Sequence, residues 1–524
     1  MEPIPRFDAI VIGSGFGGSI NALRLASAGR RTLVLERGQR YRPGEFPRDI
    51  TNVERLFWRY PRHARFRGLY EVRFFSGLAA VVASGVGGGS LIYANIHIRP
   101  DPDVFDDPRW PASVNRGSLD RHYDSVAKML AVAPVPATLH LKKRDAFVRA
   151  AQQLGRPIFD PDEAVKWAGP DEPTRASCRL CTQCEFGCQY GAKSTLDLTY
   201  LAQAERLGAE VCSDAYVTAI APADGGYVVT YRNTSVNPAR RTPESVFARR
   251  VVVCAGTLGT NELLLRCRDL TRTLPLLSAR LGHGYSANGD FLGSVCGSAN
   301  PLDPWHRPDV TSVIHFDNVR HSFTMAAPTF SRPVMDVLAS MGQPNVRWLR
   351  WLSPVVWWFA DRLLVAAFRH GFIRARPPSG QSRAADPARM TNLFAIGRDN
   401  ANGRLHLRNG QLDVVWDYAR ENEVLIANMT RAMGEVSQAY EGTFAPLATW
   451  ELFRRIITVH SLGGCHLSDS RHSGVVSPYG EVHRYPGLFV ADGSVIPTSI
   501  GFHPAMTISA VSERIAEAVV ASYP

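Results

Sequence analysis

The segment FDAIVIGSGFGGSINALRLASAGRRTLVLE, residues 7–36, decides the fold of this chain. It opens with a short apolar run rich in β-branched residues, which is typical of a strand buried inside a parallel sheet. Gly13, Gly15 and Gly18 follow this run with G-x-G-x-x-G spacing. Gly13 permits a tight turn, Gly15 lets a pyrophosphate approach the backbone, and Gly18 lets a helix pack closely on the strand. The run and its glycines therefore predict a dinucleotide-binding loop.

The helix, second strand and acidic residue that follow complete the pattern. A helix is predicted over residues 17–28, with Gly29 as its C-terminal stop, and residues 32–35 form a second strand. Glu36 stands about 20 positions after the glycines, where an acidic side chain can accept hydrogen bonds from a ribose diol. The alternative is a tight strand–helix turn without a ligand. The complete order of strand, glycines, helix, strand and acid favours a dinucleotide site.

Two more glycine-rich turns lie far along the chain. Residues 84–100, SGVGGGSLIYANIHIRP, contain three consecutive glycines, which permit positive φ and a close approach of backbone to ligand. A long dinucleotide such as FAD needs such a second loop, because its middle must also be held; the alternative is a flexible turn. A buried strand is predicted at residues 251–254, and a glycine turn leads from it into a helix over about 260–266. Ligands gather at the carboxyl ends of such strands, so this turn is expected near the first one.

Length, composition and charge limit the classes of protein to which this chain can belong. The chain has 524 residues, enough for two domains, and its 45% hydrophobic and 20% charged content is typical of a globular enzyme. The net charge of +11 is carried mainly by scattered arginines, which indicates a diffuse solvated surface rather than a nucleic-acid groove. The first strand begins too early for a signal peptide, and nine cysteines do not resemble a secreted disulfide framework. We therefore expect a cytoplasmic protein.

Four of the cysteines are crowded into residues 178–188, CRLCTQCEFGC. Cys178, Cys181, Cys184 and Cys188 follow the C-x2-C-x2-C-x3-C spacing of bacterial ferredoxins, although Gln189 stands where proline usually follows. Zinc sites more often use two pairs separated by a dozen or more residues. The spacing therefore suggests an iron–sulfur cluster, either [4Fe–4S] or [3Fe–4S], that relays electrons singly to an outside acceptor. The alternative is four reduced cysteines without metal.

Two other stretches have no clean periodicity. Residues 40–80 are rich in arginine and aromatic side chains, and we expect a helix and a loop that cross the surface. Residues 345–372 carry four tryptophans among arginines, which divide the segment into apolar runs too short to span a membrane. They are interpreted as helices that face the core over the active site. The alternative is an interfacial patch for peripheral membrane contact, through which a lipid-like substrate enters.

The remaining elements are expected from periodicity and turn residues. Asn409-Gly410 is a strong hairpin signal between two alternating strands in residues 404–416. The other predictions are helices at 118–132, 143–154, 199–207, 423–440 and 505–520, and strands at 210–221, 227–232 and 488–491.

Two histidines near the C-terminus are candidate catalytic residues. His460 begins HSLGGC, and His503 stands before Pro504 at the start of the predicted helix 505–520. Pro504 holds His503 in an extended conformation, and the helix N-terminus favours a negative flavin or phosphate oxygen. Each histidine alone is more simply interpreted as a core residue. Together, in glycine-rich loops at strand ends, they favour a catalytic role.

The chain resembles the glucose-methanol-choline (GMC) oxidoreductases, and among them the bacterial cholesterol-oxidase-like branch. The motifs that carry the resemblance are GSGFGG with Glu36, GVGGGSLIYAN, VVVCAGTLGTNELLL, HSLGGC and VADGSVIPTSIGFHPAMTISAVSER. The family implies bound FAD and the oxidation of an alcohol to a carbonyl, with His460 and His503 facing the flavin. A histidine can take the hydroxyl proton near neutral pH while flavin N5 takes the hydride. Residues 300–390 match nothing recognisable, and substrate choice is expected there.

The resemblance implies a set of FAD-binding residues: Gly13, Gly15, Phe16, Gly17, Gly18, Glu36, Arg37, Gly85, Gly87, Gly88, Gly89, Ser90, Tyr93, Asn95, Val217, Ala255, Gly256, Asp492, Gly493, His503, Pro504 and Met506. The chain also departs from the steroid oxidases. They carry Asn where His503 stands, and Tyr93 or Asn95 takes the place of an Asn in their flavin loop. The acidic residue that isomerises a steroid double bond is not found. Some similar sugar dehydrogenases carry an iron–sulfur cluster in the corresponding cysteine segment.

We thus expect an α/β fold, α+β overall, with a Rossmann-like FAD-binding domain and a discontinuous substrate domain built on a β-sheet and helices. The FAD domain is expected in residues 1–48, 76–100, 205–295 and 456–524, and the substrate domain in 49–75, 101–204 and 296–455. The predicted function is FAD-dependent oxidation of an apolar, steroid- or lipid-like alcohol, with dioxygen or an external acceptor taking the electrons. The alternatives are a flavoenzyme that reduces or isomerises its substrate and an electron-transfer module at a membrane surface.

Overall fold

The computed structural model describes residues 4–48, 52–58, 65–172, 175–235, 243–305, 308–317, 321–331 and 386–524. Segment 345–372, for which core-facing helices or an interfacial patch were predicted, lies outside these residues. None of the helices in the described part combines the length and hydropathy that crossing a lipid bilayer requires.

The first sheet is the one that the N-terminal segment predicts. Strand β1 (Arg6–Ile12) lies between β2 (Thr32–Leu35) and β12 (Pro243–Val253) and is parallel to both. β9 (Glu210–Cys212) extends the sheet beyond β2, and β22 (Leu488–Val490) pairs in parallel with the end of β12. The start of β12 pairs instead with the antiparallel hairpin of β10 (Ala215–Ala223) and β11 (Gly226–Asn233). The strand order is β10-β11-β12-β1-β2-β9.

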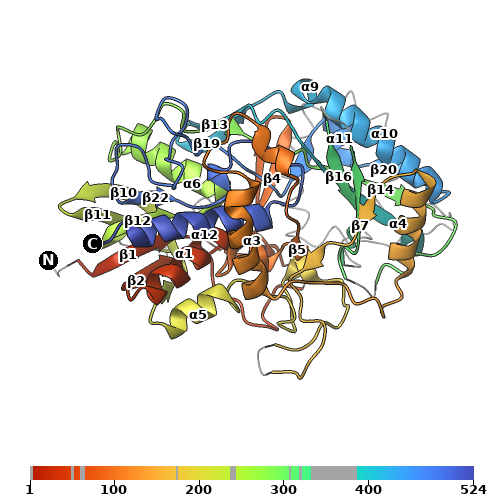
Figure 1. Ribbon diagram of the computed structural model, residues 1–524, viewed down its shortest axis with the longest axis horizontal. Coiled ribbons are helices and arrows are strands. Elements are labelled where there is room, and N and C mark those ends of the chain that lie inside the picture. Colours follow the sequence, from red (N-terminus) through yellow and green to blue (C-terminus); the bar gives the residue numbers. More distant parts are fainter. Residues whose placement is uncertain are drawn as a thin grey trace.

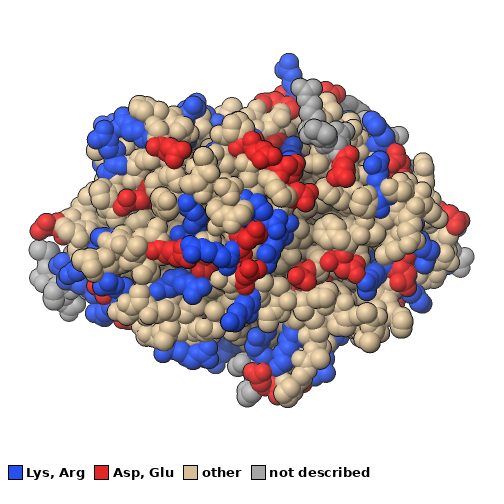
Figure 2. Space-filling view, in the orientation of Figure 1, with Lys and Arg blue, Asp and Glu red and all other residues tan. Residues whose placement is uncertain are grey.

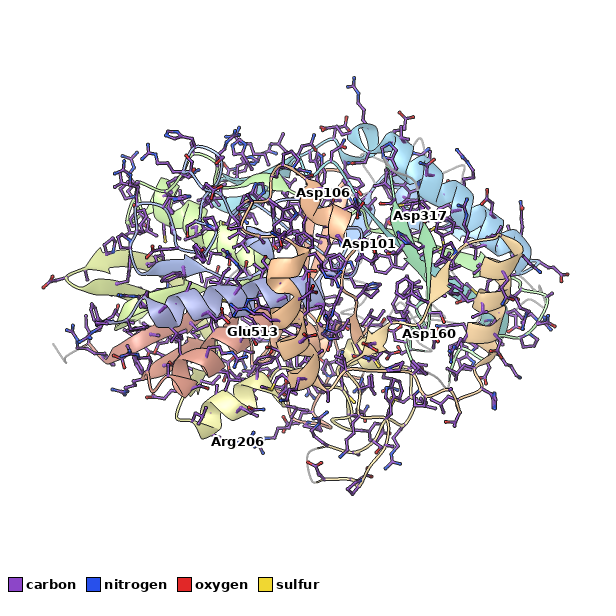
Figure 3. All side chains as sticks on the ribbon, viewed as in Figure 1. Asp101, Asp106, Asp160, Arg206, Asp317 and Glu513 are labelled. Atoms are coloured by element: carbon purple, nitrogen blue, oxygen red, sulfur yellow. The ribbon has the colours of Figure 1, made fainter. Side chains whose placement is uncertain are left out.

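Four helices pack together on one side of this sheet, as Figure 1 shows for α1, α3 and α12. They are α1 (Phe16–Ser27), α3 (Arg116–Leu130), α5 (Tyr200–Arg206) and α12 (Ala505–Ala521). Glu513 on α12, labelled in Figure 3, pairs with Arg24 of α1 at 2.7 Å and accepts a hydrogen bond from the Tyr200 hydroxyl at 2.8 Å. This buried carboxylate therefore ties three of the helices together.

The second large sheet is antiparallel and lies at the other end of the molecule (Figure 1). Its order is β20 (Thr443–Pro446), β14 (Phe291–Cys296), β17 (Thr391–Gly397), β16 (Phe323–Ala326), β15 (Val313–Phe316) and β7 (Ile158–Phe159). Helix α10 (Glu423–Ala439) packs against β14, β17 and β20, and α4 (Lys142–Gln153) packs against α10. The predicted α/β class with a Rossmann-like sheet and a second β-sheet domain is confirmed. The domain boundaries stay a prediction, and β14 crosses the one placed at residue 295.

Smaller elements connect the two sheets. Three-stranded sheets are formed by β21 (Ile456–Thr458) with β4 (Leu78–Ala83) and β3 (Tyr70–Phe75), by β13 (His283–Tyr285) with β18 (Gly403–Arg408) and β19 (Gln411–Val415), and by β5 (Ile96–His97) with β8 (Asp162–Glu163) and β6 (Ala133–Pro134). Within the described residues, the remaining α-helices are α2 (Val53–Leu56), α6 (Gly256–Leu265), α9 (Tyr418–Glu421) and α11 (Ala448–Phe453).

The expectation for residues 40–80 was wrong in part. Helix α2 is short, and the hairpin of β3 and β4 occupies residues 70–83. The sequence YEVRFF of β3 does alternate, but its charged positions, Glu71 and Arg73, are largely shielded from solvent and held in ion pairs, with 14% of each side chain exposed. A hydrophobic pattern cannot reveal a strand whose inner face carries charges, and only the tertiary contacts account for it.

Most other predicted elements are confirmed, including the 404–416 hairpin. Its turn residues Asn409 and Gly410 have φ values of 52° and 73°, the positive values that a tight hairpin turn requires. The strand predicted over 210–221 is two strands, β9 and β10, separated at Asp214, whose φ is 57°. Helix α6 begins at Gly256, one turn earlier than predicted.

Candidate active site

A cavity of about 750 Å³ opens at the carboxyl ends of β1, β2 and β12 and extends to the second sheet. Most of the predicted cofactor-binding residues line it. They are Gly13, Gly15, Phe16, Gly17, Glu36, Arg37, Gly88, Gly89, Tyr93, Val217, Ala255, Gly256, Asp492, Gly493, His503 and Pro504, and His460 lines it as well. The three glycine turns, which lie far apart in the sequence, therefore meet at one cavity.

The other predicted residues lie behind the wall of this cavity. Gly18, Gly85, Gly87, Ser90 and Met506 do not line it. Ser90 donates to the Gly87 carbonyl at 2.7 Å and accepts from the Leu196 amide at 3.0 Å, so it shapes the glycine loop from outside. Asn95 lies instead beside a second, small cavity near the cysteines.

The glycines of the first loop differ in what surrounds them. An added Cβ would lie 2.3 Å from the Cys254 carbonyl oxygen at Gly13, 1.5 Å from the Ala491 oxygen at Gly17 and 1.9 Å from the Gly13 oxygen at Gly18. These positions are glycine because other backbone segments touch them. At Gly15 the nearest atom would be 3.8 Å away, an ordinary contact. The protein's own packing therefore leaves room at Gly15, on the side of the cavity, which fits the close approach of a pyrophosphate.

Glu36 is held rigidly at the end of β2. Its Oε2 accepts hydrogen bonds from the Ser14 amide at 3.0 Å and the Ser14 hydroxyl at 2.7 Å, and its Oε1 accepts from the Gly38 amide at 3.0 Å. The residue is buried and lines the cavity. A carboxylate has about four lone-pair sites, so acceptor capacity remains for the ribose diol predicted there.

The wall beside Glu36 carries a chain of ion pairs. Glu71 pairs with Arg37 at 2.7 Å and Arg73 at 2.8 Å, and Glu262 pairs with Arg73 at 2.7 Å and Arg266 at 2.9 Å. Burial raises the pKa of Glu71, but Arg37 and Arg73 more than offset it and lower that pKa to about 2. The chain keeps this wall charged in a part of the protein that little water reaches.

We expect Glu71→Gln to lower the free energy of unfolding by about 3 kcal/mol, because Arg37 and Arg73 lose the anion they share. The pKa of Glu71 is about 2 in the folded protein and ordinarily 4.5, so its contribution is present above pH 4.5 and is lost as pH falls toward 2. Urea denaturation followed by circular dichroism between pH 3 and 7 measures this. Glu172→Gln, which removes an exposed partner of Lys166, is the control. An unchanged midpoint at pH 7 would contradict the prediction.

The structure brings the two predicted histidines together. The ring centroids of His460 and His503 are 5.5 Å apart, with the ring planes at 76°. The Phe394 ring of β17 stacks on His460 at 5.5 Å and meets His503 edge-on at 6.4 Å. The pair therefore lies where the first sheet's cavity reaches the second sheet.

Asp290 positions His460, and the sequence analysis missed it. Its side chain is fully buried, and its Oδ1 lies 2.8 Å from His460 Nδ1. Its Oδ2 accepts from the Thr458 hydroxyl at 2.9 Å and from the amides of Val459 at 2.8 Å and His460 at 3.2 Å. A carboxylate only accepts, so Nδ1 donates in this contact, and in the neutral form of the ring the lone pair is on Nε2. Asp290 lies in the glycine-rich stretch LGHGYSANGDF, and its position directly before β14 was the available signal.

His503, unlike His460, lies in surroundings that disfavour the protonated ring. Burial, then the neighbouring His460 and His97, lower the pKa of His503 well below its ordinary value. Burial alone lowers the pKa of His97 to about 3. His503 Nδ1 finds no hydrogen-bond partner in the described part of the chain. His503 is therefore a neutral imidazole at physiological pH. It lies beside His460, whose Nδ1 contacts the Asp290 carboxylate.

The four clustered cysteines line the small cavity of about 20 Å³, together with Asn95 and Lys193. All four are free thiols. Within the described ranges, no three His, Cys, Asp or Glu side chains lie close enough to hold a single metal ion. Glu185 and Phe186, which directly follow Cys184, line the large cavity. The two cavities therefore share this loop as a wall.

The charged surface agrees with the sequence analysis. Figure 2 shows basic and acidic side chains interspersed over this face of the molecule. The net charge of +11 is thus distributed on this face and is not gathered into one stripe.

Comparison with known proteins identifies the family. Models of the GMC oxidoreductase N- and C-terminal regions match residues 7–267 and 400–512. The chain is 31% identical to cholesterol oxidase from Mycobacterium tuberculosis over 555 residues, covering 98% of this chain and 91% of that protein. It is 29% identical to cholesterol oxidase from Acinetobacter baumannii over 540 residues, covering 97% and 93%.

A solved structure with the same fold is pyridoxine 4-oxidase from Mesorbium loti, with a TM-score of 0.63, 16% identity and 98% coverage of both chains. The cavity at the three glycine turns fits an elongated dinucleotide, as the room at Gly15 and the rigid Glu36 indicate. The chain therefore belongs to the GMC oxidoreductase family, and it is an FAD-dependent oxidoreductase that acts on alcohols.

Proposed function

We propose that the chain oxidises the hydroxyl group of a largely apolar, steroid- or lipid-like alcohol to a carbonyl, with the His460–His503 pair at the reacting carbon. The observation that carries this proposal is the buried Asp290–His460 contact of 2.8 Å beside His503, at one end of the cavity. Apolar side chains line this end: Leu292, Val310, Pro328, Phe330 and Phe394. Two relatives are named as cholesterol oxidases, which agrees with an apolar alcohol.

One set of these residues would bind FAD, and the histidine pair would act on the hydroxyl group of the substrate. Glu36 would hold the ribose of FAD, the glycine turns its pyrophosphate, and the N-terminus of α12, where Pro504 and Ala505 line the cavity, a negative oxygen of the flavin. When bound, FAD supplies the acceptor for the hydride that leaves the alcohol carbon. His460 Nε2 takes the hydroxyl proton, and Asp290 stabilises the imidazolium that forms. Neutral His503 hydrogen-bonds the substrate oxygen and orients it.

The room at Gly15 leads to a prediction about FAD binding. We expect Gly15→Ala to fold but to bind FAD at least about tenfold more weakly, because the methyl group occupies space meant for the pyrophosphate; tenfold corresponds to about 1.4 kcal/mol. Titration of apoprotein with FAD, followed by flavin fluorescence, measures the affinity. Gly17→Ala is the matched comparison and should destabilise the fold itself, since its Cβ would meet the Ala491 carbonyl. Unchanged FAD affinity in Gly15→Ala would place the pyrophosphate elsewhere.

The substrate class is tested by anaerobic reduction of the flavin. Purified holoprotein is mixed with cholesterol, a long-chain primary alcohol or glucose, and loss of the flavin absorbance is recorded. Bleaching by an apolar alcohol and not by glucose is expected. Bleaching by glucose alone would contradict an apolar substrate. If no alcohol bleaches the flavin, the alternative of an enzyme that reduces or isomerises its substrate is favoured.

We further propose that Cys178, Cys181, Cys184 and Cys188 hold a [4Fe–4S] or [3Fe–4S] cluster, as their ferredoxin-like spacing suggests. The common cavity that the four thiols line supports this proposal. In a cluster each cysteine binds a different iron, so the sulfurs need not converge on one ion. The cluster would make an external acceptor, rather than dioxygen, the destination of the electrons. Iron and acid-labile sulfide in anaerobically purified protein test it.

Cytoplasmic location and peripheral membrane contact stay predictions. Flotation with anionic vesicles at low and high salt tests the contact. Failure to float at either salt concentration would remove the proposal of a membrane-surface module.

A further inference from the structure

Arg48 stands beside the cysteine loop with unused hydrogen-bonding capacity. Its Nη2 donates to the carbonyl of Gly187, which lies between Cys184 and Cys188 in sequence. Its Nε and Nη1 are inaccessible to solvent and find no acceptor among the described residues. An arginine never loses its charge in a protein, so two N–H groups of a cation are left without a partner. Such groups are costly unless something absent from the protein chain satisfies them.

A second cation, Lys193, lies on the cysteine cavity itself. It is almost fully buried, and its Nζ donates to three carbonyl oxygens: Tyr93 at 2.6 Å, Cys184 at 2.9 Å and Leu91 at 3.2 Å. Lys193 therefore ties the cysteine loop to the end of the second glycine loop. It is satisfied by neutral acceptors, so it adds a charge to the site that no hydrogen-bonded anion balances.

The cysteines do not balance these cations while they are thiols. Metal binding reverses this, since a coordinating thiol is deprotonated outright.

We infer that Arg48 is the charge partner of the anionic cluster proposed for the cysteine cavity, which it stabilises through its free N–H groups and whose reduction potential it raises. The inference rests on the proposed cluster. Hydrogen bonds to the sulfurs and net charge are the factors that set cluster potentials. A nearby positive charge favours the reduced, more negative state. Arg48 is a positioning residue and not a ligand.

The location of the cysteine cavity connects the charge of Arg48 with electron transfer. Glu185 and Phe186 separate the cysteine cavity from the FAD cavity, so a cluster would lie one loop away from the flavin. On its other side the small cavity is lined by Tyr190, which is 41% exposed, and by Arg179. A cluster with a raised potential would accept electrons more readily from the flavin side and would lie near the surface for their release.

The test compares Arg48→Gln and Arg48→Lys with the wild type and with Arg408→Gln, which removes an exposed arginine that lines neither cavity. Gln keeps a donor for the Gly187 carbonyl but loses the charge, whereas Lys keeps the charge. All are purified anaerobically with FAD bound. Iron, acid-labile sulfide and FAD are measured per chain, iron loss is followed against a chelator, and the cluster potential is determined by titration with electron paramagnetic resonance detection.

We expect Arg48→Gln to keep its FAD, to lose iron at a chelator concentration about tenfold lower than the wild type, and to have a more negative cluster potential. Arg48→Lys and Arg408→Gln should match the wild-type potential. Wild-type iron retention and potential in Arg48→Gln would overturn the role of Arg48 and leave the cluster standing. A wild type without iron or sulfide would overturn the cluster and Arg48 together. If Arg48→Gln also loses FAD, Arg48→Lys decides: loss of iron there too would show that the charge is not what matters.

Discussion

Replacing His460 with alanine is expected to slow reduction of the flavin by the alcohol about 100- to 10,000-fold, the usual contribution of a positioned general base. The reason is that His460 Nε2 is the free acceptor of a ring whose Nδ1 is committed to Asp290 at 2.8 Å. His503 cannot replace it, because burial and the two neighbouring histidines lower its pKa well below the ordinary value. A neutral imidazole of such low basicity can orient a hydroxyl but is a poor acceptor of its proton.

Stopped-flow mixing of anaerobic holoprotein with a substrate alcohol measures this rate directly. His472→Ala is the control, since His472 is exposed and lies outside the cavity in the same C-terminal segment. FAD content should be unchanged in both variants. A His460→Ala protein that reduces its flavin at the wild-type rate would show that another group takes the proton.

Asp290→Asn is expected to lower the limiting rate of flavin reduction by about 100-fold or more while the dissociation constant of the substrate changes little. Asparagine preserves the shape of the buried side chain but presents a neutral amide to His460 Nδ1. The imidazolium then loses the carboxylate that stabilises it, and the single amide oxygen can accept either from His460 Nδ1 or from the donors to Oδ2, but not from both. The amide also cannot accept from Thr458, Val459 and His460 as fully as Oδ2 does.

The separation of rate from binding distinguishes this role from a structural one. Stopped-flow traces over a range of substrate concentrations give both quantities for Asp290→Asn. Equal loss of substrate binding and rate, or loss of FAD, would indicate that Asp290 only supports the fold. Asn288→Asp is not a suitable control, because Asn288 holds the Phe502 and Ile500 backbone beside His503; His472→Ala again serves.

Most of the predicted cofactor-binding residues do line the large cavity, because glycine turns and an acidic residue at strand ends form motifs that can be recognised in the sequence. The G-x-G-x-x-G spacing is a local motif. The backbone contact that requires glycine at Gly18 is also local, whereas Gly13 and Gly17 are touched by distant backbone, at Cys254 and Ala491. Glu36 follows its strand at a spacing set by the length of one helix and two turns. The hairpin at Asn409-Gly410 was predictable for the same reason, since both residues need positive φ.

Buried charges were not predictable in this way. Glu71 and Arg73 made β3 look irregular, because their ion pairs with Arg37 and Glu262 join residues up to 189 positions apart. Arg48 belongs to no sequence motif. It stands out because two of its side-chain nitrogens find no hydrogen-bond acceptor among the described residues. A hydrophobic pattern indicates which residues are apolar. It does not indicate which charged side chains form ion pairs or hydrogen bonds in the folded protein.

The sequence by itself determined the family, the dinucleotide loops, the histidine pair and the cysteine spacing, since each depends on residues close together in the chain or on turns that only certain residues can make. The tertiary structure alone decided that Asp290 orients His460 across 170 residues and that the cysteine loop forms a wall of the large cavity. The physical reason is that the protonation state and the contacts of a side chain depend on its burial and on its neighbours in space. Those neighbours come together only when distant strands pack, and no local sequence pattern encodes that packing.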